Sequence, residues 1–155
     1  MSKIYIQGTY GAYSHLAALE IDPNAEVIPC KTFDECFIKT SSESNSRMVI
    51  PESNRITGNI GIEYLIFKHR LNIYGEHFQK IEHNLLGQSD ANLSDITDVF
   101  SHTQGLSQCS NYIKKNNFVE HIRADTAGSA EAISKKKIKS EAAIASSLSA
   151  KIYKL

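Results

Sequence analysis

Short apolar runs of strand-forming residues alternate along the first half of the chain with segments of helical periodicity. Strands are predicted at Lys3–Gln7, Glu26–Pro29 and Arg47–Ile50, and helices are predicted to begin near Ala12, Phe33 and Asn59. Each strand-like run is followed by a helical segment, which is the βα repetition of a mostly parallel sheet.

A long extended stretch from Leu71 to Gly87 interrupts this alternation and contains no helical pattern. We interpret it as a crossing segment between two lobes. After it, strands are predicted at Asp98–Phe100, Phe118–Arg123 and Ala142–Ala145, and helices over Gln104–Lys115, from Ala127 and from Ser146. The pattern therefore predicts a two-lobed α/β protein over residues 1–155, with lobe one at about 1–75, lobe two at about 76–155, and the ligand in an interlobe cleft.

Composition narrows the class of protein. The 155 residues include 17 basic and 17 acidic side chains, so the formal net charge of zero argues against nucleic-acid binding. The three cysteines and six histidines match neither a disulfide framework nor a metal-ligand spacing, so we expect reduced thiols and no metal. Without an apolar signal or membrane-spanning run, a cytoplasmic protein with no membrane contact is expected.

Three predicted strand-to-helix turns share hydroxyl groups and small residues: Gly8–Ser14, Ser101–Gln104 and Asp125–Ser129. Free N–H groups at a helix start carry partial positive charge, and glycine lets a ligand approach the backbone. Three such turns around one cleft would suit an organic anion with several carboxylates. The alternative is that these residues are ordinary N-caps. A fourth segment, Pro51–Gly58, follows an apolar strand and is either a binding loop or a connector.

The turns and several further stretches, in this order along the chain, resemble the prephenate dehydratase family over almost the whole sequence. The stretches are Gly8–His15, Glu26–Phe33, Gly75–Phe78, Leu85–Gly87, Ser101–Gln104 with Gln108–Cys109, Asp125–Ala130, and Ala142–Ser146 with Ile152–Tyr153. The resemblance implies a two-lobed periplasmic-binding-protein-like (type II) fold, a homodimer, and prephenate in the cleft. It also implies a cofactor-free lyase reaction, in which prephenate loses carbon dioxide and water to give phenylpyruvate for phenylalanine synthesis.

Carried over by position, the resemblance assigns catalytic roles to Asn54, Ser101 and Gln108. The residues that it places around the substrate are Gly11, Ala12, Tyr13, Ser14, Ser53, Arg55, His102, Gln104, Thr126, Ala127 and Gly128. Ser53 stands where the family has a glutamate, and Arg55 stands where it has a serine. Arg55 would either pair with a substrate carboxylate or face solvent in its loop.

With the sequence ending at Leu155, we expect two family features to be absent. One is the Thr-Arg-Phe segment that supplies the family's catalytic threonine, and the other is the C-terminal ACT domain that senses phenylalanine. Two alternatives to a prephenate dehydratase stay open at this point. The chain could be a non-catalytic module that binds an organic anion, or an arogenate dehydratase acting on the amino counterpart of prephenate.

Overall fold

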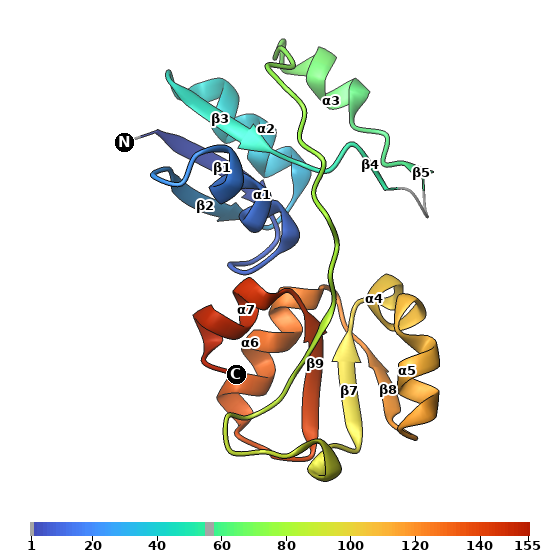
Figure 1. Ribbon diagram of the computed structural model, residues 1–155. Helices are drawn as coiled ribbons and strands as arrows, with labels where there is room; N and C mark the ends of the chain where they lie inside the picture. Colours follow the sequence, from blue (N-terminus) through green and yellow to red (C-terminus); the bar gives the residue numbers. More distant parts are fainter. Residues whose placement is uncertain (1, 55–57) are drawn as a thin grey trace. The chain divides into compact units, whose positions relative to one another are not determined.

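The computed structural model describes residues 2–54 and 58–155, which form two compact units (Figure 1). Unit 1 contains the described residues of Met1–Thr9 and Tyr13–Gln79, and unit 2 contains Tyr10–Ala12 and Lys80–Leu155. The short segment Tyr10–Ala12 therefore belongs to unit 2, although the residues on both sides of it belong to unit 1.

Unit 1 is built on a parallel three-stranded sheet of order β2-β1-β3. Its strands are β1 (Lys3–Gln7), β2 (Glu26–Cys30) and β3 (Ser46–Val49), and its first two helices are α1 (Tyr13–Ile21) and α2 (Phe33–Ser42). The Thr32 hydroxyl caps α2 by accepting from the Glu35 N–H at 3.1 Å. The predicted βα alternation is confirmed here.

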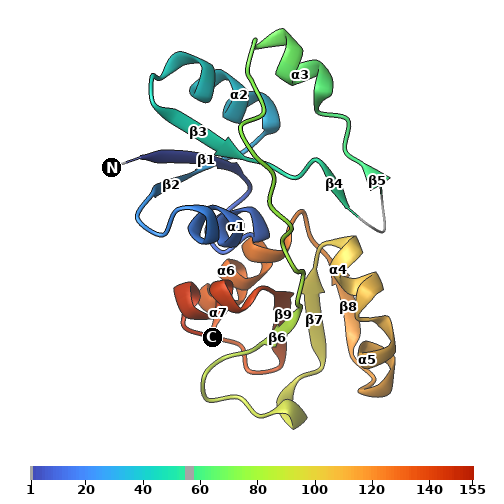
Figure 2. The ribbon, with the colours of Figure 1, turned by 45° about the horizontal axis from the view of Figure 1, so that its top comes forward.

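Side chains that alternate along β1 divide the core of unit 1 into two layers. Ile4 and Ile6 pack with Ala18 of α1, whereas Tyr5 packs with Cys36 of α2. Because neighbouring residues of a strand point to opposite faces of the sheet, α1 and α2 cover opposite faces. Figure 2 shows the two helices on either side of the sheet.

The rest of unit 1 corrects one predicted helix. The helix expected from Asn59 begins four residues later, as α3 (Glu63–Lys68), and Gly58–Asn59 is instead the short strand β5, antiparallel to β4 (Ser53–Asn54). Gly58 and Gly61 have φ of 78° and 80°, which are left-handed values that a helix cannot contain. The end of α3 reaches α2 through the rings of His69 and Phe37, whose centroids are 5.7 Å apart.

Unit 2 contains a four-stranded sheet of order β6-β9-β7-β8, in which only β6 is antiparallel to its neighbour. Its strands are β6 (Asn84–Leu86), β7 (Asp98–Ser101), β8 (Val119–Ile122) and β9 (Glu141–Ala145). Its helices are α4 (Thr103–Gln108), α5 (Ser110–Lys115), α6 (Thr126–Lys136) and α7 (Ser147–Tyr153), with a 3-10 turn η1 at Leu93–Asp95.

The same alternation builds two apolar layers in unit 2. Ala142 and Ile144 of β9 pack with residues of α4 and α5, and Ala143 and Ala145 pack with α6. Small residues in the central strand let helices on both faces approach closely. Together the two sheets confirm the prediction of a mostly parallel α/β protein.

Two further sequence predictions can be compared with the structure of unit 2. The helix predicted over Gln104–Lys115 is divided at Cys109, whose φ of −101° and ψ of 8° end α4 before α5 begins. The stretch from Leu71 to Gly87 contains no helix, as predicted, and its end forms β6. Lys135 and Lys136 lie in the last turn of α6, where their charge suits the helix dipole.

No helix among the described residues 2–54 and 58–155 is long and apolar enough to cross a membrane.

Candidate functional site

Three helices of unit 2 begin at the edge of its sheet where the parallel strands end. β7 leads into α4, β8 into α6 and β9 into α7, so the starts of all three helices gather at one edge (Figure 1). In open α/β sheets this edge is the usual place for a ligand, because loops and free helix N–H groups converge there. We call it the carboxyl edge of unit 2.

Asp125 caps α6 with its carboxylate, which accepts from the Gly128 N–H at 2.5 Å. Its backbone oxygen also accepts from the Ser129 hydroxyl at 2.7 Å. The predicted binding residues Thr126, Ala127 and Gly128 are thus the first turn of a capped helix. The capping interpretation applies here, and an anion at this turn would share the helix start with the Asp125 carboxylate.

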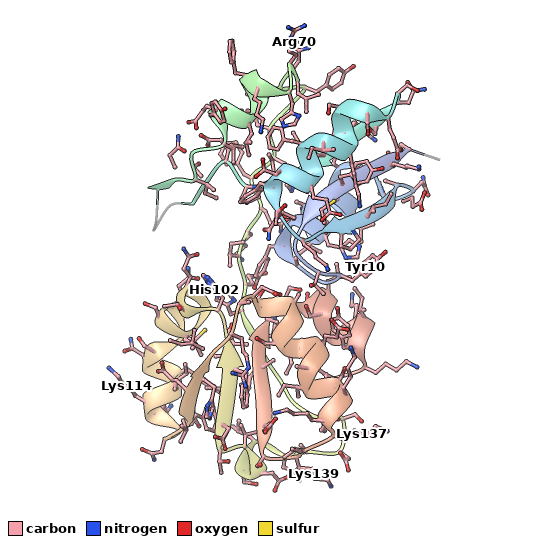
Figure 3. The ribbon with its side chains drawn as sticks, turned by 180° about the vertical axis from the view of Figure 1, so that it is seen from behind. Tyr10, Arg70, His102, Lys114, Lys137 and Lys139 are labelled. Carbon is pink, nitrogen blue, oxygen red and sulfur yellow. The ribbon has the colours of Figure 1, made fainter. Side chains whose placement is uncertain are left out.

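Ser101 and His102 follow one another at the end of β7 and have different environments. Ser101 is fully buried and donates its hydroxyl hydrogen to the Ile144 backbone oxygen of β9 at 2.7 Å. His102 is half-buried and caps α4, since its Nδ1 accepts from the Gln104 N–H at 3.3 Å. Figure 3 shows His102 at the opposite end of unit 2 from Lys137 and Lys139, so those lysines lie away from the carboxyl edge.

Gln108, the last residue of α4, is exposed and interacts with a histidine outside the helices. The His83 Nε2–H donates to the Gln108 Oε1 at 2.9 Å, because an amide oxygen can only accept. The two N–H groups of the amide then remain as donors. Nothing in the sequence pattern points to this partner, which comes from the extended stretch just before β6.

The first predicted turn also reaches unit 2. Gly11 is buried, and its backbone oxygen accepts from the hydroxyls of Ser146 at 2.5 Å and Ser149 at 3.0 Å. The Tyr10 backbone oxygen accepts from the Tyr153 hydroxyl at 2.8 Å. We call Ser146, Ser149 and Tyr153 the hydroxyl row. Ser146 and Tyr153 lie in stretches that carry the family resemblance, but the sequence analysis assigns a site role to none of the three.

Glycine is required at position 11 for two reasons. Its φ is 90°, a left-handed value, and a Cβ atom there would lie 2.9 Å from the Ser149 Cα and closer still to the Ser149 Oγ. The turn can therefore approach α7 only without a side chain.

Ala12, the next predicted site residue, follows Gly11 in unit 2. The remaining predicted site residues that the structure describes belong to unit 1. Tyr13 and Ser14 begin α1, Ser53 is exposed in β4, and Asn54 pairs through its backbone with Gly58 of β5. Arg55 lies outside the described residues.

Burial decides the protonation of two groups near the carboxyl edge. It raises the pKa of the Tyr153 hydroxyl to about 12, with smaller contributions from Glu131 and Asp125, so this hydroxyl stays a donor at neutral pH. It also raises the pKa of the Cys109 thiol, which follows Gln108 and is accordingly a poor nucleophile. Within residues 2–54 and 58–155 there is no group of three His, Cys, Asp or Glu side chains that could hold a metal.

In unit 2 the structure thus brings eight predicted site residues to one edge, together with His83, Asp125 and the hydroxyl row. The eight are Gly11, Ser101, His102, Gln104, Gln108, Thr126, Ala127 and Gly128. The eight residues supply backbone N–H groups, two side-chain amides, one imidazole and hydroxyls, which suit a polar anionic ligand and include no strong nucleophile.

Comparisons with known proteins identify the family and the fold of the chain. The family model for prephenate dehydratase matches residues 4–155. The arogenate dehydratase/prephenate dehydratase 2 of Arabidopsis thaliana, a chloroplastic protein, is 38% identical over 99% of this chain and 40% of its own length. The chain therefore spans about two fifths of the length of the curated relatives that it matches first.

Two solved structures share the fold. A quorum quenching acylase of a novel type superposes with a TM-score of 0.91 at 31% identity, over 98% of this chain and 56% of its own. The prephenate dehydratase of Staphylococcus aureus superposes with a TM-score of 0.79 at 28% identity, over 99% of this chain and 57% of its own. These likenesses confirm the predicted fold class, the two-lobed periplasmic-binding-protein-like α/β fold.

Proposed function

Since the chain belongs to the prephenate dehydratase family, we propose that it carries out the decarboxylating dehydration of prephenate to phenylpyruvate in phenylalanine biosynthesis. The match of the family model to residues 4–155 is the observation that carries this proposal. The polar groups at the carboxyl edge of unit 2 support it, because prephenate is a di-acid.

The reaction depends on the positioning of the substrate more than on a reactive side chain. Loss of carbon dioxide and of the ring hydroxyl makes the ring aromatic, and this drives the reaction. The protein must hold two carboxylates and donate a hydrogen bond or proton to the departing hydroxyl. A site of N–H and O–H donors without a strong nucleophile is consistent with those requirements.

We assign the donor role to Gln108. Its Oε1 is occupied by His83, so its amide N–H groups are left to donate to a carboxylate or to the hydroxyl of the ligand. Ser101 is fully buried and donates its hydrogen to Ile144, and we therefore propose that it serves the site by holding the end of β7, which leads into α4, against β9. Asn54 is the third residue of the proposed catalytic set. We propose that Arg55, the next residue in the sequence, pairs with a substrate carboxylate.

The direct test mixes the purified chain with prephenate near neutral pH and follows phenylpyruvate by its absorbance in alkali. The spontaneous acid-promoted reaction is subtracted with a protein-free sample. Gln108→Ala should lower the rate or the affinity, while Asn111→Ala, an exposed amide in α5, is the matched control. Binding of prephenate without turnover would identify a binding module in place of an enzyme, and wild-type behaviour of Gln108→Ala would remove that residue from the site.

Two related activities have support of their own. The Arabidopsis relative is named for arogenate as well as prephenate, so arogenate should be supplied in parallel and phenylalanine measured as its product. The TM-score of 0.91 to a quorum quenching acylase supports a second candidate, hydrolysis of an N-acyl amide. Release of the free acid from such a substrate, absent in the protein-free sample, would support it.

We also propose that the chain forms a homodimer. Large apolar side chains are exposed close together in sequence, with Phe67 83% exposed, Tyr74 96% and Phe78 88%. Exposed apolar side chains that gather in one patch are typical of a protein interface, and we propose that these three contribute to one. Light scattering after gel filtration should give twice the mass of 17.2 kDa. Phe78→Ser should shift the equilibrium to the monomer, whereas Ile38→Ser, which changes an exposed residue of α2, should not.

A cytoplasmic location is the remaining part of the proposal. Cys30, Cys36 and Cys109 are all free thiols, and Cys30 and Cys36 are buried, as expected in a reducing compartment. Cell fractionation with a tagged chain would test it, and recovery in an organelle fraction would contradict it.

A further inference from the structure

The hydroxyl row lies on one face of α7 and contacts two consecutive carbonyl groups of a distant turn. Ser146, Ser149 and Tyr153 are spaced by three and four residues, which places them on the same side of a helix. Their partners, the backbone oxygens of Tyr10 and Gly11, lie more than 130 residues away in sequence. Only a folded unit 2 can bring these groups together.

Each serine hydroxyl in this contact has one hydrogen, and both serines donate it to the Gly11 backbone oxygen. Ser146 donates its hydrogen to Gly11 and accepts the Ser149 N–H at 3.1 Å, so it caps α7 and binds the turn at once. Ser149 donates to the same Gly11 oxygen at 3.0 Å. Both serines are 1% exposed or less, so their hydroxyls depend on acceptors within the protein, and the Gly11 oxygen is such an acceptor for both.

Tyr153 adds a third bond from a fixed position. Its ring packs against the apolar layer that contains Phe100 and Ile133, while its hydroxyl reaches the Tyr10 oxygen. The ring is held by packing, so the hydroxyl is already oriented before it meets the turn.

The turn held in this way leads directly into the start of α1. Gly11 and Ala12 are followed by Tyr13 and Ser14, the first residues of that helix, and all four are proposed to bind the substrate. We propose that the hydroxyl row positions this turn for the substrate, which makes Ser146, Ser149 and Tyr153 positioning residues that do not touch the ligand. This inference rests on the proposed function.

The consequence for binding follows from geometry. A backbone N–H group binds a carboxylate well only within a few tenths of an ångström of its best distance, and a displacement of about 1 Å can cost a factor on the order of a hundred in catalysis. Three hydroxyl bonds on two adjacent carbonyls restrict the turn in both position and rotation. Removing one bond should loosen the turn without removing any group that contacts the ligand.

The test uses the whole 155-residue chain and the variant Tyr153→Phe, which keeps the ring and its packing and deletes only the hydroxyl. Ser149→Ala is the second variant. The matched controls are Tyr112→Phe, which alters an exposed tyrosine of α5, and Ser134→Ala, which deletes a hydroxyl bonded within α6. Calorimetric titration with prephenate gives the Kd and the stoichiometry, and hydrogen exchange follows the backbone amides of residues 8–14.

Both variants should raise the Kd by about two- to tenfold and speed exchange in residues 8–14, with the controls unchanged. A purely structural effect would lower the stoichiometry, because part of the protein would be unfolded, and would leave the Kd as it is. Wild-type Kd in Tyr153→Phe and Ser149→Ala overturns the inference, whether or not exchange becomes faster. If the wild-type chain binds no prephenate, the proposed function fails, and the exchange rates still show separately whether the hydroxyl row orders the turn.

Discussion

Replacing Gly11 by alanine should destabilise the protein more than the same change at Gly61 or Gly75. An alanine at φ of 90° is in a left-handed conformation, which costs about 1–2 kcal/mol. Its Cβ would also lie 2.9 Å from the Ser149 Cα, a backbone atom of α7 that cannot move alone, and overpacking of this kind costs about 1–3 kcal/mol. The expected loss of unfolding free energy is therefore about 2–5 kcal/mol.

The variants at Gly61 and Gly75 separate the cost of the left-handed conformation from the cost of the close contact with α7. Gly61 has a φ of 80° but nothing within 4 Å of the position that a Cβ atom would take, so Gly61→Ala should show the conformational cost alone, about 1–2 kcal/mol. Gly75 has open space and no left-handed φ, so Gly75→Ala should stay within about 0.5 kcal/mol of the wild type.

Urea unfolding followed by circular dichroism and tyrosine fluorescence measures all three, since the chain has no tryptophan. The two signals should be analysed separately, because the two units need not unfold together. Equal losses for Gly11→Ala and Gly61→Ala would refute the close approach of the turn to α7. A loss for Gly75→Ala as large as the other two would show that the reasoning from φ is wrong.

Single contacts elsewhere in the two units can be tested in the same way. Phe37→Ala should lower the unfolding free energy by about 3–5 kcal/mol, because Phe37 is fully buried, and urea denaturation measures this. Asp125→Ala should cost about 0.5–2 kcal/mol through loss of the α6 cap, whereas Asp125→Asn, which can still accept from Gly128, should cost less in the same assay. A hydrogen bond to Glu43, together with burial, raises the pKa of Tyr5 to about 12, so the folded state holds this proton more tightly than the unfolded state. The contribution of this proton to the unfolding free energy is fully present below about pH 10 and is lost as the pH rises toward 12. Tyr5→Phe should lack this part of the alkaline loss when thermal midpoints are compared across that range.

The architecture is predictable because it depends on local periodicity. Ile4 and Ile6 alternate with Tyr5, and Ala142 and Ile144 alternate with Ala143, so strand positions and their two buried faces can be inferred from the sequence. The start of α3 is harder to place because Ile60 and Ile62 extend the apolar pattern of the helix toward its N-terminus, while the left-handed glycines that exclude a helix there leave no trace in periodicity. The division at Cys109 escapes prediction for the same reason.

The site is harder to predict because its contacts join distant parts of the chain. Gln108 can be named by resemblance, but its partner His83 lies 25 residues earlier, in a stretch without secondary structure of its own. Ser146 and Ser149 look like the ordinary start of a last helix. Their hydrogen bonds to Gly11 depend on tertiary structure, which the sequence pattern around them does not contain.

The assignment of Tyr10–Ala12 to unit 2 has a practical consequence for protein engineering. Neither unit is a continuous stretch of the chain, because unit 2 includes the three residues Tyr10–Ala12 in addition to Lys80–Leu155. A fragment that starts at Lys80 would lack the Gly11 carbonyl oxygen that accepts from Ser146 and Ser149, and two hydroxyls that are buried in the whole chain would lose this acceptor. A separately expressed unit 2 would be better designed as a circular permutant or with a peptide of residues 8–14 supplied in trans, and its gain in solubility with that peptide would report the contact directly.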